Sequence, residues 1–142
     1  MTAQVKYADV EAGEELTPRT YQVQRVDLIK YAGASGDFNV IHWNERIAKS
    51  VGLPNVIAHG MFTMAQAGRY VTDWVGDPGA VLDFGVRFSA VVVVPDDDNG
   101  ALIELSGKIE EKLEGNRVAL ALTAKSGDAK VLRRARVIVQ LA

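Results

Sequence analysis

Hydrophobic spacing divides the chain into a helical first half and a second half with a period of two. Apolar residues recur every three or four positions over residues 24–32, 45–51 and 61–75, which predicts three helices. From residue 81 onward apolar and polar residues alternate, which predicts strands over residues 82–90, 103–110, 118–124 and 131–141. A further short strand is expected at residues 21–23. This order indicates helices packed on one face of an antiparallel sheet.

The longest expected helix, residues 61–75, has an unusual apolar face. The residues at helical spacing that should be buried are mostly small: Met61, Met64, Ala65, Gly68, Val71, Thr72 and Val75. Glycine in the middle of a helix costs about 1 kcal/mol relative to alanine. Close approach of a sheet would offset that cost, so we expect a buried helix around which the sheet wraps.

Capping and turn residues support these boundaries. Asn44 is suited to cap the second helix, and Gly52 with Pro54 should end it. Asp27 is suited to the first turn of the first helix. Turn-forming residues at 76–79, 95–100, 115–116 and 126–128 separate the expected strands.

Composition adds exclusions to this picture. A chain of 142 residues is expected to form one domain, residues 1–142. The absence of cysteine excludes disulfides, thiolate metal ligands and cysteine nucleophiles. A net charge of −2 without a long basic run argues against nucleic acid as the main partner. The N-terminus lacks the apolar core of a signal peptide, and no apolar stretch approaches the ~20 residues of a membrane span, so we expect a cytoplasmic protein.

The candidate chemistry lies in two short segments. Asp37 and His42 are five positions apart, which on a straight helix would place them about 140° from each other. Gly36 and Asn39 favour a loop there, and a bent segment would let the acid and the imidazole act together. Gly60 begins the longest expected helix, so its N–H can point from the helix N-terminus at a developing negative charge.

These segments, read in full, resemble a known family. Residues 31–45 resemble the hydratase motif of MaoC-like (3R)-hydroxyacyl thioester dehydratases, and residues 57–64 resemble the start of their central helix. The similarity extends over the whole chain and is greatest to the actinobacterial single-domain type, the B subunit of the mycolic-acid dehydratase. The resemblance implies an α+β hot-dog fold, in which a curved antiparallel sheet wraps a long helix. It also implies a homodimer or a heterodimer with a paralogous subunit, with the acyl-pantetheine arm entering between the subunits.

The resemblance also implies roles for individual residues. Asp37 and His42 would be the acid–base pair that dehydrates a (3R)-3-hydroxyacyl thioester to a trans-2-enoyl thioester, or hydrates it in reverse. The thioester would be carried on acyl carrier protein or coenzyme A, with fatty-acid elongation as the expected setting, and no cofactor is expected. Gly60 would donate its N–H to the thioester oxygen. Asn39 would hold the loop or orient the catalytic water.

Other interpretations stay open from the residues alone. The chain could be a hot-dog thioesterase, or a non-catalytic subunit that binds the acyl chain for an active partner. His59, the second of two histidines, is expected to be structural. A metal site built from Asp37, His42 and His59 lacks a recognised ligand spacing, so no metal is expected. The basic stretch at residues 133–136 either keeps a strand soluble or docks the carrier of the thioester.

Overall fold

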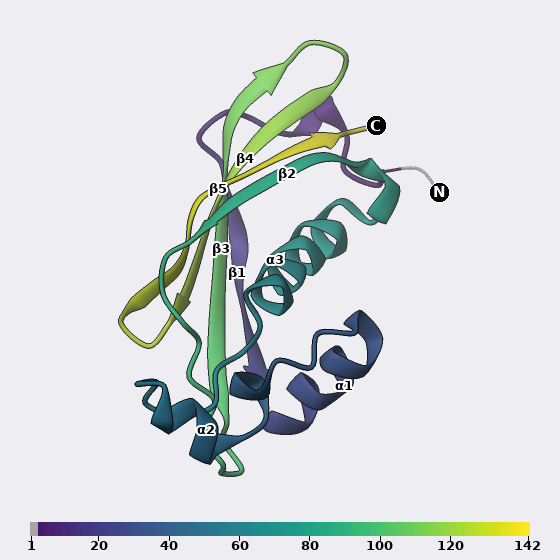
Figure 1. The fold of residues 1–142 in the computed structure, drawn as a ribbon. Helices are drawn as coiled ribbons and strands as arrows, with labels where there is room; N and C mark the ends of the chain where they lie inside the picture. The colour runs from purple at the N-terminus through teal and green to yellow at the C-terminus, as the bar shows by residue number, and fades with distance from the viewer. Residues whose placement is uncertain (1–2) are drawn as a thin grey trace.

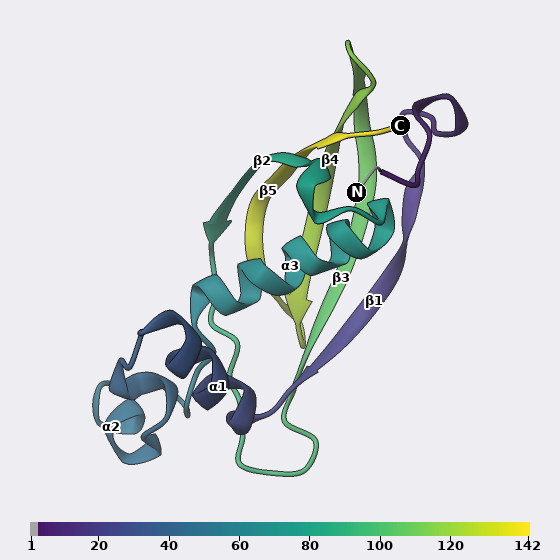
Figure 2. The same cartoon turned by 90° about the vertical axis from the view of Figure 1, so that its right-hand side faces the viewer.

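A long helix lies in the hollow of a curved antiparallel sheet (Figures 1 and 2). The structure is a computed structural model that describes residues 3–142. The sheet has the order β1-β3-β4-β5-β2, and the helix in its hollow is α3 (Gly60–Val75). This arrangement confirms the expected α+β hot-dog fold. Across the described residues, no helix is both long and apolar enough to cross a membrane.

The remaining elements follow the expected order with small changes at their ends. The helices are α1 (Arg25–Ser35) and α2 (Glu45–Ser50), with short 3-10 turns η1 (Tyr7–Asp9), η2 (Val40–His42) and η3 (Pro78–Ala80). The strands are β1 (Glu15–Val23), β2 (Val81–Phe88), β3 (Ala101–Leu113), β4 (Arg117–Ser126) and β5 (Ala129–Gln140). Both views gather α1 and α2 near the N-terminal end of α3.

The strand pattern comes from alternation between core and solvent. In β3, Ile103, Leu105 and Ile109 are buried, whereas Glu104 and Lys108 between them are exposed. Burying each of these apolar side chains is worth roughly 1.5–3 kcal/mol. The inward face of β3 therefore forms part of the floor against which α3 packs.

The first strand is longer than its sequence pattern predicted. β1 pairs with β3 from Glu15 onward, and the register shifts between Leu16 and Arg19. Pro18 lies inside that shift and has no N–H to give to the ladder, so an edge strand with an irregularity accommodates it. Pairing with β3 extends the strand beyond residues 21–23, the only part with an apparent strand pattern.

The buried face of α3 differs in part from the predicted one, since Val71 and Val75 are buried as expected. Met61 and Ala65 are exposed, and the buried residues are Phe62, Thr63, Ala67, Tyr70, Val71 and Val75. The rings of Phe62 and Tyr70 fill the hollow of the sheet. The Tyr70 hydroxyl donates a hydrogen bond to the carbonyl oxygen of Thr17 at 3.1 Å. The prediction selected small residues for close approach, whereas the curved sheet leaves room for the aromatic side chains.

Helix caps fix both ends of the loop that carries Asp37 and His42. Asn44 Oδ1 accepts a hydrogen bond from the Ile47 N–H at 3.1 Å, which confirms the predicted cap of α2. At the end of α1, Gly36 adopts a left-handed conformation with φ 77°, and its N–H donates to the Ala32 carbonyl oxygen. Because residues with a Cβ avoid this conformation, Gly36 lets the helix end and the chain turn sharply.

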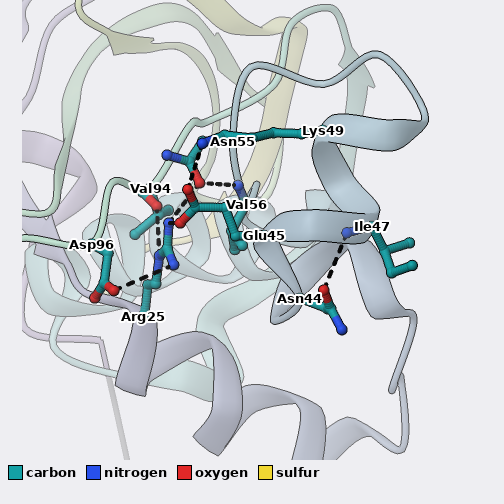
Figure 3. Close-up of polar contacts among 9 residues, drawn as sticks. All are labelled: Arg25, Asn44, Glu45, Ile47, Lys49, Asn55, Val56, Val94 and Asp96. Atoms are coloured by element: carbon teal, nitrogen blue, oxygen red, sulfur yellow. Dashed lines mark hydrogen bonds and ion pairs between the residues drawn. The ribbon is translucent and has the colours of Figure 1, made fainter.

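One arginine ties the helical segment to the loops beside the sheet (Figure 3). Arg25 Nε donates to the Val94 carbonyl oxygen at 3.1 Å, and its Nη2 donates to Glu45 Oε2 at 2.8 Å and Asn55 Oδ1 at 2.6 Å. Asp96 approaches Arg25 to 3.8 Å. These contacts join α1, α2 and the loops before α3 and β3. The segment that carries Asp37 and His42 is thereby fixed to the rest of the fold.

Candidate active site

A bent turn brings the predicted acid and imidazole together. The Asp37 N–H donates to Ser35 Oγ at 3.2 Å, and Asp37 Oδ1 accepts from the Asn39 N–H at 3.2 Å. Asn39 Oδ1 accepts from the Ile41 N–H at 3.3 Å and caps the 3-10 turn η2. Short bonds of this kind replace helical ones and bend the backbone. The bend allows the side chains of Asp37 and His42 to approach each other.

The imidazole of His42 is buried and has a fixed orientation. Its side chain is 7% exposed, and Nδ1 lies 2.7 Å from the carbonyl oxygen of Ile57. A carbonyl oxygen only accepts, so Nδ1 carries the hydrogen and Nε2 of the neutral ring keeps a free lone pair.

The surroundings of His42 favour the neutral ring. Burial is the largest influence and lowers the pKa of His42 below its ordinary value of 6.5. The Ile57 carbonyl opposes this effect, His59 adds to it and Asp37 opposes it, in decreasing order. The ring is therefore neutral at pH 7 and can accept a proton.

Three titratable residues form the cluster: Asp37, His42 and His59. One nitrogen of each imidazole and one Asp37 carboxylate oxygen lie within 4.8 Å of one another. The two rings are stacked, with centroids 3.7 Å apart and planes inclined by 25°. Two histidines that share a metal ion need lone pairs converging on one point about 2.0–2.1 Å away. Stacked rings direct theirs along nearly parallel planes, so this arrangement does not favour a shared ion.

The N-terminus of α3 and one member of the cluster, His42, border a small pocket. His59 is the residue before the helix, and Gly60 is its first residue. Among residues 3–142, no acceptor receives a hydrogen bond from the Gly60 N–H. Gly60 and His42 line the same pocket of about 130 Å³, together with Thr63 and Phe88. Gly60, whose amide has no acceptor among these residues, and the buried imidazole therefore border one space.

Glycine at position 60 also provides room. A Cβ built there would lie 3.2 Å from two ring atoms of Phe88, which is tighter than most real contacts. Phe88 ends β2 and is 49% exposed, so its ring covers one side of the pocket. The close packing and the free N–H are compatible, because both depend on the absence of a side chain at this position.

Sequence reasoning missed the residues that support the cluster. Tyr31 packs against His59, with ring centroids 4.8 Å apart, and Phe62 packs against Tyr31 at 5.6 Å. The anchoring contacts of Arg25 were also missed, because its partners Glu45, Asn55 and Val94 are 20, 30 and 69 positions away. Asn39 was singled out, and its side chain holds the loop; contact with substrate stays a prediction for it.

Comparison with known proteins identifies similar domains. The family model described as "MaoC like domain" matches residues 8–126. The 3-hydroxyacyl-thioester dehydratase X of Mycobacterium tuberculosis is 41% identical over 66 residues, which are 46% of this chain and 22% of that protein. The 3-hydroxybutyryl-CoA dehydratase of Methylorubrum extorquens is 29% identical over 129 residues, covering 89% of this chain and 78% of the relative.

A solved structure described as a MaoC-like dehydratase superposes with a TM-score of 0.93 at 41% identity. The match covers 96% of this chain and 42% of that one. The matched residues thus span about a fifth of the Mycobacterium relative, and the chain spans less than half of the solved chain. The family model covers most of the chain, from within the 3-10 turn η1 to the end of β4. The chain therefore belongs to the MaoC-like dehydratase family.

Proposed function

We propose that this chain catalyses the reversible dehydration of (3R)-3-hydroxyacyl thioesters to trans-2-enoyl thioesters. The observation that carries the proposal is the close approach of the Asp37 carboxylate and the His42 imidazole, within the 4.8 Å cluster. An acid and a base this close can act on neighbouring carbons of one small substrate. The names of the relatives, a thioester dehydratase and a CoA dehydratase, support the same reaction class.

In the proposed dehydration, the enzyme takes one proton from the substrate and gives one proton to it. Dehydration breaks the C2–H bond and the C3–O bond, and the hydroxyl leaves as water after gaining a proton. The bare Nε2 of neutral His42 is suited to accept the C2 proton, and the Asp37 carboxyl group and the protonated His42 ring are the groups that can serve the departing hydroxyl. If His42 performs both transfers, the proton that it takes from C2 leaves with the hydroxyl and the ring is neutral again. If Asp37 supplies the proton to the hydroxyl, the proton gained by His42 must return to Asp37 before the next turnover. Hydration runs the same transfers in reverse.

The Gly60 N–H is the proposed donor to the thioester oxygen. Removing the C2 proton builds enolate character on that oxygen, and a preorganised amide stabilises the charge without rearrangement. The amide has no acceptor among residues 3–142, and Gly60 lines the pocket that His42 also lines. The N-terminal end of a 16-residue helix adds a favourable dipole at the same place.

A second subunit is the proposed completion of this pocket. Its volume of about 130 Å³ is below the ~300–1,000 Å³ usual for small-molecule sites. Apolar side chains remain exposed beside it: Met61 is 55% exposed, Phe88 49% and Val91 44%. A homodimer or a heterodimer with a paralogous hot-dog subunit would cover these side chains and supply the missing wall. The native mass of the purified protein tests this part.

Acyl carrier protein is the proposed carrier, with coenzyme A as the alternative. Three basic residues, Lys130, Arg133 and Arg134, line a surface hollow of about 360 Å³. Such a surface attracts the phosphates of coenzyme A and an acidic carrier protein alike. Comparing kcat/KM for the same acyl group on acyl carrier protein and on coenzyme A shows which carrier the protein prefers. A preference for acyl carrier protein would support a role in fatty-acid elongation.

The experiment that tests the function follows one substrate by two readouts. Purified protein is given a crotonyl thioester, and both loss of the enoyl group and release of free thiol are measured. The proposal expects loss of the double bond, formation of the (3R)-3-hydroxyacyl product and no thiol. Thiol release would identify a thioesterase instead. Absence of both reactions in the isolated chain, with activity in a complex that survives Asp37→Asn, would identify a non-catalytic subunit.

A further inference from the structure

His59 connects the two candidate catalytic residues physically. Its side chain is 2% exposed, and its Nε2 lies 3.0 Å from the backbone carbonyl oxygen of Asp37. Its ring is stacked on that of His42 at 3.7 Å, and Tyr31 closes a third side at 4.8 Å. The ring therefore lies between the backbone of the acid and the side chain of the base.

The contact with Asp37 fixes the tautomer of His59. The Asp37 carbonyl oxygen can only accept, so Nε2 carries the hydrogen. The other nitrogen, Nδ1, is buried and has no hydrogen-bond partner among the described residues. One hydrogen bond and two ring contacts hold the His59 side chain. The ring contacts are with His42, a residue of the site, and with Tyr31, which packs beside it.

The carbonyl bond reaches across the fold, whereas the other polar contacts of Asp37 do not. Its N–H and its carboxylate bond to Ser35 and Asn39, each two positions away. His59 is 22 positions away and precedes the first residue of α3. Among residues 3–142, the His59 contact is thus the polar link between Asp37 and the helix whose N-terminus carries Gly60.

We propose that His59 is a positioning residue that sets the separation of Asp37 and His42. It holds the backbone of Asp37 through Nε2–H and the ring of His42 through stacking. This inference rests on the proposed dehydratase function for its kinetic consequence. An error of about 1 Å in the placement of reacting groups costs about 10²-fold in rate, so loss of this link should reduce kcat more than it changes KM.

Two variants separate the hydrogen bond from the ring contact. His59→Phe keeps a planar ring against His42 and removes the N–H donor. His59→Gln keeps an N–H donor and removes the ring. We expect His59→Phe to lose about 10²-fold in kcat with KM little changed, and His59→Gln to retain more activity than His59→Phe. Equal kcat values in His59→Phe and the wild type would overturn the proposal, because the N–H bond to Asp37 would then not be needed.

The titration of His42 gives a readout that does not need activity. The chain has two histidines, so His42 is the sole imidazole in His59→Phe, and its NMR titration is read directly. Asp37 and His59 are the titratable groups that act on His42, and the other described residues that line its pocket carry no titratable side chain. Removing His59 takes away a group that opposes protonation, so the titration midpoint of His42 should rise. An unchanged midpoint would contradict the proposed contact.

The carbon-13 shift of the Asp37 carbonyl completes the test. Loss of the hydrogen bond should move this signal in His59→Phe, and His59→Gln should leave it nearer the wild-type position. If the wild type has no hydratase activity, the proposed function fails, while these two NMR measurements still decide whether His59 holds the turn. If activity is present and neither NMR signal moves, the positioning role fails alone.

Discussion

His42 Nδ1 donates a hydrogen bond to the carbonyl oxygen of Ile57 over 2.7 Å, and this contact leaves Nε2 as the ring nitrogen available for chemistry. Ile57 is itself held, because it forms an isolated β-bridge with Val93 and its N–H donates to the Ile41 carbonyl oxygen at 3.3 Å. The imidazole is thus oriented by the backbone of the segment before α3, which is itself bonded to two other segments of the chain. Orientation and burial together suit His42 to the role of base that we propose for it.

The pH dependence of activity should reflect the burial of His42. Burial lowers the pKa of His42 below 6.5, so the neutral, proton-accepting form persists at pH values where an exposed histidine would be charged. In dehydration, neutral His42 takes the C2 proton, so the acid limb of kcat/KM for dehydration reports this group in the free enzyme and should have its midpoint below pH 6.5. A midpoint above 6.5 would contradict the assignment of His42 as the base.

The pH dependence of stability follows from the same residue with a defined sign. The pKa of His42 is lower in the folded chain than the ~6.5 of an exposed histidine in the unfolded chain. Between these two values the unfolded chain binds more protons, so the free energy of unfolding should rise with pH, by up to about 1.4 kcal/mol per pH unit. Above pH 6.5 this contribution is complete. Urea unfolding at several pH values measures the slope, and His42→Gln should reduce it; an identical slope in that variant would assign the effect elsewhere.

The Gly60 amide can be removed with little damage to the helix. Gly60 is the first residue of α3, a position that tolerates proline, and His59 before it has φ −58° and ψ 137°, which proline also permits. Gly60→Pro should lower kcat by about 10²–10³-fold relative to Gly60→Ala, which keeps the N–H and carries a similar Cβ against Phe88. Circular dichroism should report the same helix content in both variants. Equal kcat in the two variants would mean that the glycine serves packing alone.

The Arg25 network should contribute measurably to stability. Hydrogen bonds to charged groups are worth about 1.5–3 kcal/mol, and Arg25 joins Glu45, Asn55 and Val94. Arg25→Met should therefore lower the free energy of unfolding by about that amount, and Arg25→Lys by less, since it keeps the charge without the fork.

Arg19→Met is the matched control for the Arg25 variants. Arg19 pairs with Asp73 at 2.9 Å, but its side chain is 51% exposed, and such surface pairs contribute about 0–1 kcal/mol. Chemical denaturation compares the variants. Equal losses in Arg25→Met and Arg19→Met would show that the network does not anchor the segment.

Local pattern was sufficient for much of the fold. Helices near residues 24–32, 45–51 and 61–75 and the four later strands were predicted, because periods of 3.6 and 2 report which side of an element is buried. The start of β1 was not predicted, since its pairing partner β3 is about 90 positions away in the sequence. The prediction of the buried face of α3 was wrong in part, because the curvature of the sheet decides which side chains fill its hollow.

The site could be predicted only as far as its motif extends. Asp37, His42 and Gly60 lie in two short segments, and their proximity in the structure agrees with the expected pair. The stacking of His59 on His42 could not be derived, because it depends on how α3 begins relative to the loop. The expectation that His59 is merely structural is therefore replaced by the proposal that it positions both partners.

The most direct measurement is a double-mutant comparison of Asp37→Asn and His42→Gln. If the two residues work as one unit, each single variant should lose about 10²–10⁴-fold in kcat/KM for crotonyl thioester hydration, and the double variant should lose little more. Full activity in either single variant, or a loss in the double variant equal to the product of the two single losses, would contradict the account.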